Sequence, residues 1–176
     1  MEFNSDSNQV EFVISPARIS KELKRKAKEI AIETTKKIDN IGLLAVEMFL
    51  TENDEILINE IAPRPHNSGH FSIEACPTSQ FEQHLRSILN LPLGKTSHKN
   101  FAVMLNLVGD YGFNGNVFYE NLESSFSEVD THIHIYGKEK TRQNRKMGHI
   151  TIICDKFEDA YRKATYLKNK IKVKTL

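Results

Sequence analysis

Two glutamates and the polar segment after the second one are the residues of this chain best suited to chemistry. Glu47 lies inside an apolar run, and Asn59 and Glu60 lie at the end of the next apolar run. The segment 61–70 then reads IAPRPHNSGH and contains an arginine, two histidines, another asparagine and a serine. Carboxylates on neighbouring strands, followed by a polar loop, are typical of a site for a metal ion and an anion.

The spacing of the two glutamates predicts that they face each other. If Asn53 and Asp54 form the two-residue loop of a β-hairpin, Glu47 and Glu60 lie directly opposite on one face, with Cβ atoms about 4.5–5.5 Å apart. Two carboxylates at roughly 5 Å repel each other by about 3 kcal/mol at an effective dielectric constant of about 20. A divalent cation, Mg²⁺ or Mn²⁺, would remove this repulsion, with substrate phosphates completing its coordination. The alternatives are that one glutamate is protonated, or that the register slips and each glutamate has its own basic partner.

The polar loop carries donors suited to an oxyanion. Arg64 offers a planar fork for phosphate or carboxylate, and the prolines on both sides of it stiffen the backbone. Further donors follow within six residues: His66, Asn67, Ser68 and His70. The alternative is a turn-rich surface loop whose histidines are only solvated.

A second cluster of charge lies near the C-terminus. Five basic residues fall within positions 138–146. Such a run is often a solvated turn, and a nucleic-acid patch is disfavoured by the formal net charge of +1 and by the absence of interleaved aromatic residues. A small phosphorylated ligand fits better, with Lys138 and Arg145 as its candidate phosphate partners.

The elements that position these residues follow from periodicity and capping signals. Ser79 with Glu82, and Asp155 with Glu158, predict capped helix starts, and the hairpin strands are apolar on both faces, so we expect their sheet to be covered on both sides. The expected strands span 10–15, 43–50, 55–61, 101–108, 132–136 and 149–154, and the expected helices span 20–38, 79–89 and 155–171.

Composition restricts the class of protein. The 176 residues suit one compact domain or one domain with a small appendage. Nothing in the composition favours binding to nucleic acid or to a membrane, because the net charge is near zero and no apolar run reaches transmembrane length. The two cysteines show no metal-binding spacing, and the N-terminus has no signal-peptide core, so we expect a reduced, cytoplasmic protein.

Five motifs together resemble a known family. They are VEMF at 46–49, NEIAPRPHNSGH at 59–70, SQFEQH at 79–84, LPLG at 91–94 and RKMGH at 145–149. This set resembles the 5-(carboxyamino)imidazole ribonucleotide synthase family, the ATP-grasp enzymes of purine biosynthesis also called the ATPase subunit of phosphoribosylaminoimidazole carboxylase. One departure is Gln143-Asn144, where the family usually has Pro-Gly.

The resemblance implies a fold and a reaction. The fold class is α+β: residues 1–95 form the C-terminal half of an ATP-grasp fold, mainly antiparallel sheet with helices, and residues 100–176 form a small α/β C-terminal domain. The reaction converts ATP, bicarbonate and 5-aminoimidazole ribonucleotide to the N-carboxylated ribonucleotide, ADP and phosphate. Carboxyphosphate is the expected activated form of bicarbonate.

The resemblance also implies roles for individual residues. Glu47 and Glu60 match the Mg²⁺ ligands, and Asn59 with Glu60 matches the ATP-contacting pair. Arg64, His66 and Asn67 match the loop at the bicarbonate and aminoimidazole end of the site. Lys138 and Arg145 match the positions that hold the ribonucleotide 5′-phosphate.

The resemblance reaches only the C-terminal part of the family's longer proteins. The lysines, glycine-rich phosphate loop and adenine hinge of the first ATP-grasp half have no counterpart here. We therefore expect this polypeptide to be inactive alone, with a second copy or the N-terminal half as its partner. The alternatives are another ATP-grasp ligase such as a formate-dependent purine transformylase, a non-catalytic module that binds metal or ribonucleotide, and an interaction protein that docks on a separate N-terminal half.

Overall fold

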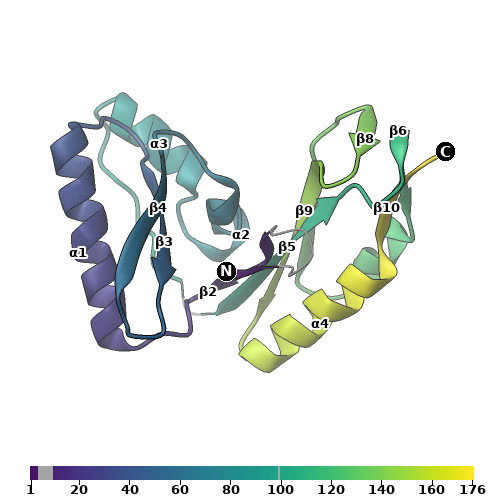
Figure 1. Ribbon diagram of the computed structural model, residues 1–176, viewed down its shortest axis with the longest axis horizontal. Coiled ribbons are helices and arrows are strands. Elements are labelled where there is room, and N and C mark those ends of the chain that lie inside the picture. Colours follow the sequence, from purple (N-terminus) through teal and green to yellow (C-terminus); the bar gives the residue numbers. More distant parts are fainter. Residues whose placement is uncertain (4–9, 99) are drawn as a thin grey trace. The chain divides into compact units, whose positions relative to one another are not determined.

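The computed structural model describes residues 1–3, 10–98 and 100–176, which form two compact units. Unit 2 spans Arg18–Ser97, and unit 1 combines Met1–Ala17 with His98–Leu176 (Figure 1). The expected first domain, residues 1–95, differs from unit 2 in its first 17 residues. These residues include strand β2 (Val10–Ser15), which pairs with β5 (Phe101–Val108) of unit 1.

Unit 2 begins with a long helix, followed by a hairpin and short helices. Ser20 and Ser79 cap their helices as predicted, because each hydroxyl accepts a hydrogen bond from the backbone N–H three residues later. The elements, in chain order, are α1 (Lys21–Ile38), β3 (Ala45–Leu50), β4 (Ile56–Ala62), η1 (Asn67–Gly69), α2 (Ser72–Ala75) and α3 (Gln80–Ile88).

The turn of the β3–β4 hairpin differs from the predicted two-residue loop. Thr51 N–H donates to the Glu55 carbonyl at 2.9 Å, so residues 52–54 form a three-residue loop, and Asp54 takes a left-handed conformation with φ 57°. Leu50 consequently pairs with Ile56 rather than with residue 57. The sequence contains no Gly that marks this loop type, and Asp is among the few residues that tolerate a left-handed φ.

A β-bulge restores the register farther along the hairpin. Met48 pairs with Ile58, whereas Glu47 pairs with Glu60, so Asn59 is the extra residue on β4. The bulge offsets the one-residue shift made at the turn. The predicted pairing of Glu47 with Glu60 is therefore confirmed, although the loop from which we derived it was wrong.

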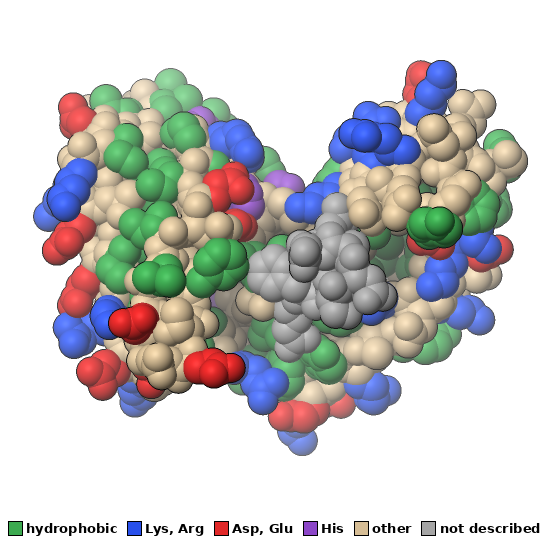
Figure 2. Space-filling view, in the orientation of Figure 1, with side chains coloured by type: hydrophobic (Ala, Val, Ile, Leu, Met, Phe, Trp, Pro, Cys, Tyr) green, Lys and Arg blue, Asp and Glu red, His purple; other side chains and the backbone are tan. Residues whose placement is uncertain are grey.

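The hairpin is also less covered than its apolar strands predict. Phe49 and Leu57 are 50% and 52% exposed, and hydrophobic side chains lie open over β3 and β4 (Figure 2). The two strands form a sheet of their own, with no third strand among the described residues. The expectation of a sheet covered on both sides is wrong for these residues, because apolar sequence predicts a preference for burial but does not supply the covering layer.

Unit 1 is built on a five-stranded antiparallel sheet in the order β1-β2-β5-β9-β7. A second sheet has the order β10-β6-β8. The remaining bounds are β1 (Glu2–Phe3), β6 (Asn114–Glu120), η2 (Leu122–Ser127), β7 (Thr131–Ile135), β8 (Lys140–Arg142), β9 (Lys146–Cys154), α4 (Phe157–Lys170) and β10 (Lys172–Thr175).

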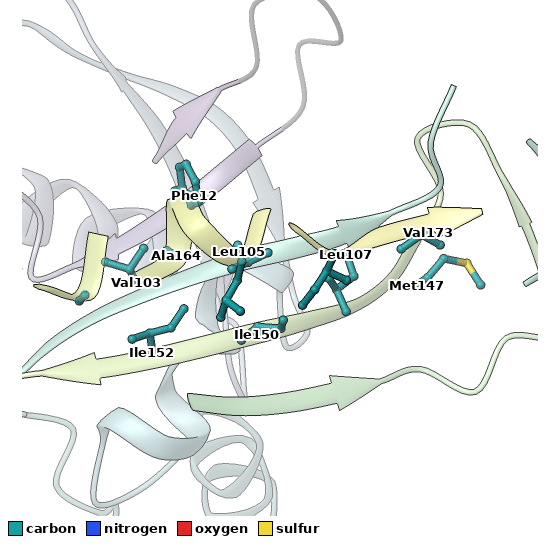
Figure 3. Close-up of a cluster of buried hydrophobic side chains, with 12 residues drawn as sticks. Phe12, Val103, Leu105, Leu107, Met147, Ile150, Ile152, Ala164 and Val173 are labelled. Carbon is teal, nitrogen blue, oxygen red and sulfur yellow. The ribbon is translucent and has the colours of Figure 1, made fainter. Parts of the chain in front are cut away.

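The core of unit 1 lies between α4 and one face of this sheet (Figure 3). Val103 pairs with Ile152 and Leu105 pairs with Ile150, so alternate residues of β5 and β9 present their side chains to the same face. Helix α4 contributes a stripe of small and apolar residues at helical spacing, which lets it pack closely on the sheet. These residues are Ala160, Ala164 and Leu167.

The start of α4 corrects one capping prediction. Lys156 is the N-cap and makes no side-chain capping bond. Asp155 instead accepts a hydrogen bond from the side-chain amide of Asn100, a residue distant in sequence, at 2.8 Å.

No helix in the described part of the chain is long and apolar enough to cross a membrane.

Replacing Ile150 by alanine is expected to lower the free energy of unfolding of unit 1 by about 2–5 kcal/mol, because it leaves a cavity in a packed core. Ile150 is 0% exposed. Urea denaturation followed by tyrosine fluorescence measures this loss. The chain has no tryptophan, and its tyrosines all belong to unit 1, at positions 111, 119, 136, 161 and 166.

The matched control is Ile135→Ala on the neighbouring strand β7, where the side chain is 41% exposed. This change is expected to cost less than about 1 kcal/mol. Equal losses in the two variants would contradict the assignment of Ile150 to the core.

Candidate functional site

The acidic pair lies at the bulge of the β3–β4 hairpin. Glu47 and Glu60 are paired across the two strands, and the ring of His66 lies close to both carboxylates. His66 Nδ1 is 3.5 Å from Glu47 Oε1, and His66 Nε2 is 3.9 Å from Glu60 Oε1. The Glu47 side chain is 15% exposed and that of Glu60 is 52% exposed, so one carboxylate is largely enclosed and the other is open to a ligand.

This geometry answers one question that the sequence left open. Among the residues that the structure describes, the two glutamates do not each have a basic partner of their own; they share one histidine. The imidazole attracts both carboxylates only when it is protonated.

The donor set fits a hard divalent cation that keeps part of its coordination for a ligand. Two carboxylates supply oxygen donors, which Mg²⁺ and Mn²⁺ prefer. Within the described ranges no group of three or more His, Cys, Asp or Glu side chains is arranged to hold a metal alone. Such a pair therefore suits Mg²⁺ bound together with phosphate and water rather than in an all-protein cage.

The loop after β4 is held by hydrogen bonds to α3. The Gln80 side-chain amide accepts from the His66 backbone N–H at 3.0 Å and donates to the His66 carbonyl at 2.9 Å. Ser68 Oγ lies 2.9 Å from His66 Nδ1, which orients the ring locally. Sequence reasoning missed Gln80, because a glutamine at the start of a helix carries no distinctive signal.

The other loop residues predicted to act are placed around His66. Arg64 is exposed, and its guanidinium donates to the Pro65 carbonyl at 3.1 Å. Asn67 begins η1 and is half-buried, whereas Asn59, the bulge residue, is exposed. The hairpin and its loop therefore bring the acidic pair and His66 together, and Arg64, Asn59 and Asn67 lie next to them along the chain.

A cavity of about 340 Å³ opens beside this loop within unit 2. Val46 and Phe71 line its apolar part, and His66 and Gln80 line its polar part. Cys76 also lines it, and burial raises the pKa of this thiol above its ordinary value. The thiol stays protonated near neutral pH, which argues against a nucleophilic role.

The basic segment of unit 1 holds its two predicted phosphate partners near each other. Lys138 Nζ donates to the Lys146 carbonyl at 2.6 Å and lies 5.4 Å from the ring centre of Tyr136. Arg145 donates to the Lys140 carbonyl at 2.7 Å. Burial, and then the charge of the Arg145 guanidinium, lowers the pKa of Lys138. The two cations therefore repel each other.

The buried His149 contacts Tyr136, the aromatic residue beside Lys138. Tyr136 Oη lies 3.0 Å from His149 Nδ1, and the His149 ring stacks on that of His134 with centroids 4.5 Å apart. His149 is 2% exposed. Tyr136 and His149 were also missed as supporting residues, because residue type does not show which rings pack together when they lie far apart in the sequence.

The turn before Arg145 forms although Gln143-Asn144 replaces the family's usual Pro-Gly. Asn144 has φ 63°, a left-handed conformation that Gly adopts freely and that Asn tolerates better than most residues. Its N–H donates to the Gly109 carbonyl at 2.9 Å, and the Gly109 N–H donates to the Arg145 carbonyl at 2.9 Å. The backbone of Arg145 is thus fixed without the Pro-Gly pair.

Comparisons with known proteins agree with both units. A model of the ATP-grasp domain matches residues 2–81, and a model of the phosphoribosylaminoimidazole carboxylase C-terminal domain matches residues 102–163. The N5-carboxyaminoimidazole ribonucleotide synthase of Bacillus subtilis is 46% identical over 80% of this chain and 35% of its own length. The phosphoribosylaminoimidazole carboxylase of Candida albicans is 43% identical over 92% of this chain and 29% of its own length.

Solved structures give the same result. The N5-carboxyaminoimidazole ribonucleotide synthetase of Thermotoga maritima has a TM-score of 0.90 and 48% identity, covering 94% of this chain and 46% of that one. The Aspergillus clavatus enzyme, solved with ADP and 5-aminoimidazole ribonucleotide, has a TM-score of 0.84 and 34% identity, covering 95% and 45%. The chain thus spans less than half the length of these relatives. It belongs to the N5-carboxyaminoimidazole ribonucleotide synthase family of ATP-grasp proteins.

Proposed function

We propose that this chain contributes to the ATP-dependent carboxylation of 5-aminoimidazole ribonucleotide by bicarbonate, a step of purine biosynthesis. The observation that carries the proposal is the pairing of Glu47 with Glu60 beside His66. Family membership supports it, because the Bacillus subtilis and Thermotoga maritima relatives are named as synthases of this product.

In this proposal the acidic pair binds Mg²⁺ or Mn²⁺, and Asn59 with Glu60 contacts ATP. The ion would neutralise charge on the triphosphate during phosphoryl transfer. Glu47, which is largely enclosed, keeps its position through the hairpin, whereas the exposed Glu60 and the bulged Asn59 face ligand.

The loop residues act at the bicarbonate end. Arg64 is exposed and can pair with an oxyanion through its planar fork, and Asn67 can donate from its side-chain amide. His66 contacts the acidic pair, so it links the metal-binding carboxylates to the loop. Electrostatic stabilisation of the transferred phosphoryl group by these fixed donors is the main catalytic effect.

Lys138 and Arg145 bind the 5′-phosphate of the ribonucleotide. Two cations that repel each other gain from a ligand with two negative charges, and Tyr136 packs beside the lysine. We further propose a cytoplasmic location, and either a second copy or an N-terminal ATP-grasp half as the partner.

The 176-residue chain alone is expected to release no ADP from ATP with bicarbonate and 5-aminoimidazole ribonucleotide, because its acidic pair supplies one side of a nucleotide site. Adding the N-terminal half of the Bacillus subtilis relative is expected to restore release that depends on bicarbonate. A coupled ADP assay measures both. Turnover by the chain alone at the rate of a full-length relative, or restored turnover that needs formate instead of bicarbonate, would contradict the proposal.

Glu47→Gln and Glu60→Gln are each expected to weaken binding of Mg²⁺–ATP about tenfold or more in the restored complex, because a carboxylate ligand is replaced by a neutral amide. Isothermal titration calorimetry measures the affinity. Glu55→Gln, at the turn of the same hairpin, removes an equal charge from an exposed position and is the control. Unchanged affinity in both test variants would remove these residues as ligands.

Lys138→Met and Arg145→Met are each expected to weaken binding of 5-aminoimidazole ribonucleotide about tenfold, since a charged hydrogen bond contributes about 1.5–3 kcal/mol. Arg142→Met, on β8, is the control for lost charge. The lowered pKa of Lys138 predicts that affinity is full near neutral pH, where the phosphate is a dianion, and falls as the lysine deprotonates, at a lower pH than for an ordinary lysine.

Lys138→Arg should move this fall to higher pH, because arginine stays charged. Affinity measured from neutral to alkaline pH tests the prediction. A profile that is the same for lysine and arginine at this position would show that Lys138 does not contact the phosphate.

A further inference from the structure

The Gln80 side-chain amide, on the first residue of α3, has an orientation that its neighbours determine. Gln80 is 8% exposed. Its Oε1 accepts from the His66 backbone N–H at 3.0 Å, and its Nε2 donates to the His66 carbonyl at 2.9 Å. A backbone N–H only donates and a backbone carbonyl only accepts, so the amide cannot be turned over without losing both bonds.

This orientation determines the protonation of a neighbouring histidine. Gln80 Nε2 also lies 2.8 Å from Nδ1 of His70. Since Nε2 carries only hydrogens, Nδ1 must accept this hydrogen bond. An imidazole whose Nδ1 accepts is neutral and carries its proton on Nε2.

The surroundings hold this arrangement tightly. A Cβ on Gly69 would lie 2.5 Å from Gln80 Oε1, so only glycine lets the loop pack this closely on the amide. The Ser72 hydroxyl accepts from the Gln80 backbone N–H at 2.9 Å and donates to the Gly69 carbonyl at 2.6 Å. The His70 ring also stacks on Phe81, with centroids 5.5 Å apart and planes 22° apart.

We propose that Gln80 is a positioning residue that holds the main chain of His66 and fixes His70 as the neutral tautomer protonated on Nε2. The ring of His66 also accepts at Nδ1, from the Ser68 backbone N–H at 3.4 Å, and it lies beside the two carboxylates. His70 has its basic nitrogen occupied by Gln80, so it can serve as a neutral hydrogen-bond donor but not as a base.

The tautomer follows from the hydrogen bonds alone.

Nitrogen-15 NMR of the histidine-labelled chain at neutral pH tests the tautomer directly. Nδ1 of His70 is expected at the shift of an unprotonated ring nitrogen, and Nε2 at that of a protonated one. The measurement uses the 176-residue chain and needs no substrate, so it stands or falls separately from the ADP assay. A proton on Nδ1 in the wild-type chain would overturn the proposal.

Gln80→Glu tests the role of the amide. A carboxylate in its place cannot donate to Nδ1, so the His70 Nδ1 resonance is expected to move to the protonated position. Gln83→Glu is the matched control on the same helix, because the Gln83 amide makes the same pair of bonds with the Gly94 backbone, at 2.9 Å and 2.7 Å.

The control is expected to leave the His70 resonances unchanged. An equal change in both variants would show a general effect of a weakened α3 and would overturn the specific role of Gln80. If Gln80→Glu does not fold, the wild-type spectrum still decides the tautomer.

Discussion

Two like charges on one face of a two-stranded hairpin are the constraint on which the candidate site depends. Side chains alternate between faces along a strand, so a slip of one residue would send Glu60 to the face opposite Glu47. The three-residue turn introduces such a slip, and the bulge at Asn59 removes it. A bulge also unpairs one residue and bends the strand locally. The same irregularity that brings the carboxylates together thus leaves Asn59 exposed next to Glu60.

The loop that follows converts this pairing into a fixed arrangement. His66 is held through its own backbone by the amide of Gln80, so its ring reaches the acidic pair without relying on side-chain contacts alone. Preorganised donors and charges contribute most to catalysis when they need not move during the reaction. Placing the support on a helix rather than in the loop gives an otherwise irregular segment a rigid frame.

Local signals in the sequence predict local structure well here. Ser20 and Ser79 cap their helices, and β2 and β5 have the predicted bounds, because capping and alternation depend on residues close in the chain. The failures involve distant partners. Asp155 bonds to Asn100 instead of capping α4, and the cover of the hairpin depends on residues outside its own sequence.

The site shows the same division between local and distant information. The pairing of Glu47 with Glu60 was predicted from spacing, but the prediction assumed a two-residue turn that does not form. The residue type of Asp54 does not distinguish a two-residue loop from a three-residue loop. The contact of both glutamates with His66, and the hydrogen bonds from the Gln80 amide to the His66 backbone, depend on the path of the chain after β4. Neither could be read from residue types, although both lie in motifs that the sequence singled out.

The candidate cluster in each unit uses the same physical principle, with charges of opposite sign. In unit 2 a pair of carboxylates shares a single histidine, and in unit 1 Lys138 and Arg145 are close enough for the arginine to lower the pKa of the lysine. Like charges held together raise the energy of the empty protein, and an oppositely charged ligand recovers that energy on binding. A fold that needed these residues only for stability would gain by separating them. The proposed function accounts for both clusters, with a divalent cation at the pair beside the Asn59 bulge and a phosphate at the pair beside the Asn144 turn.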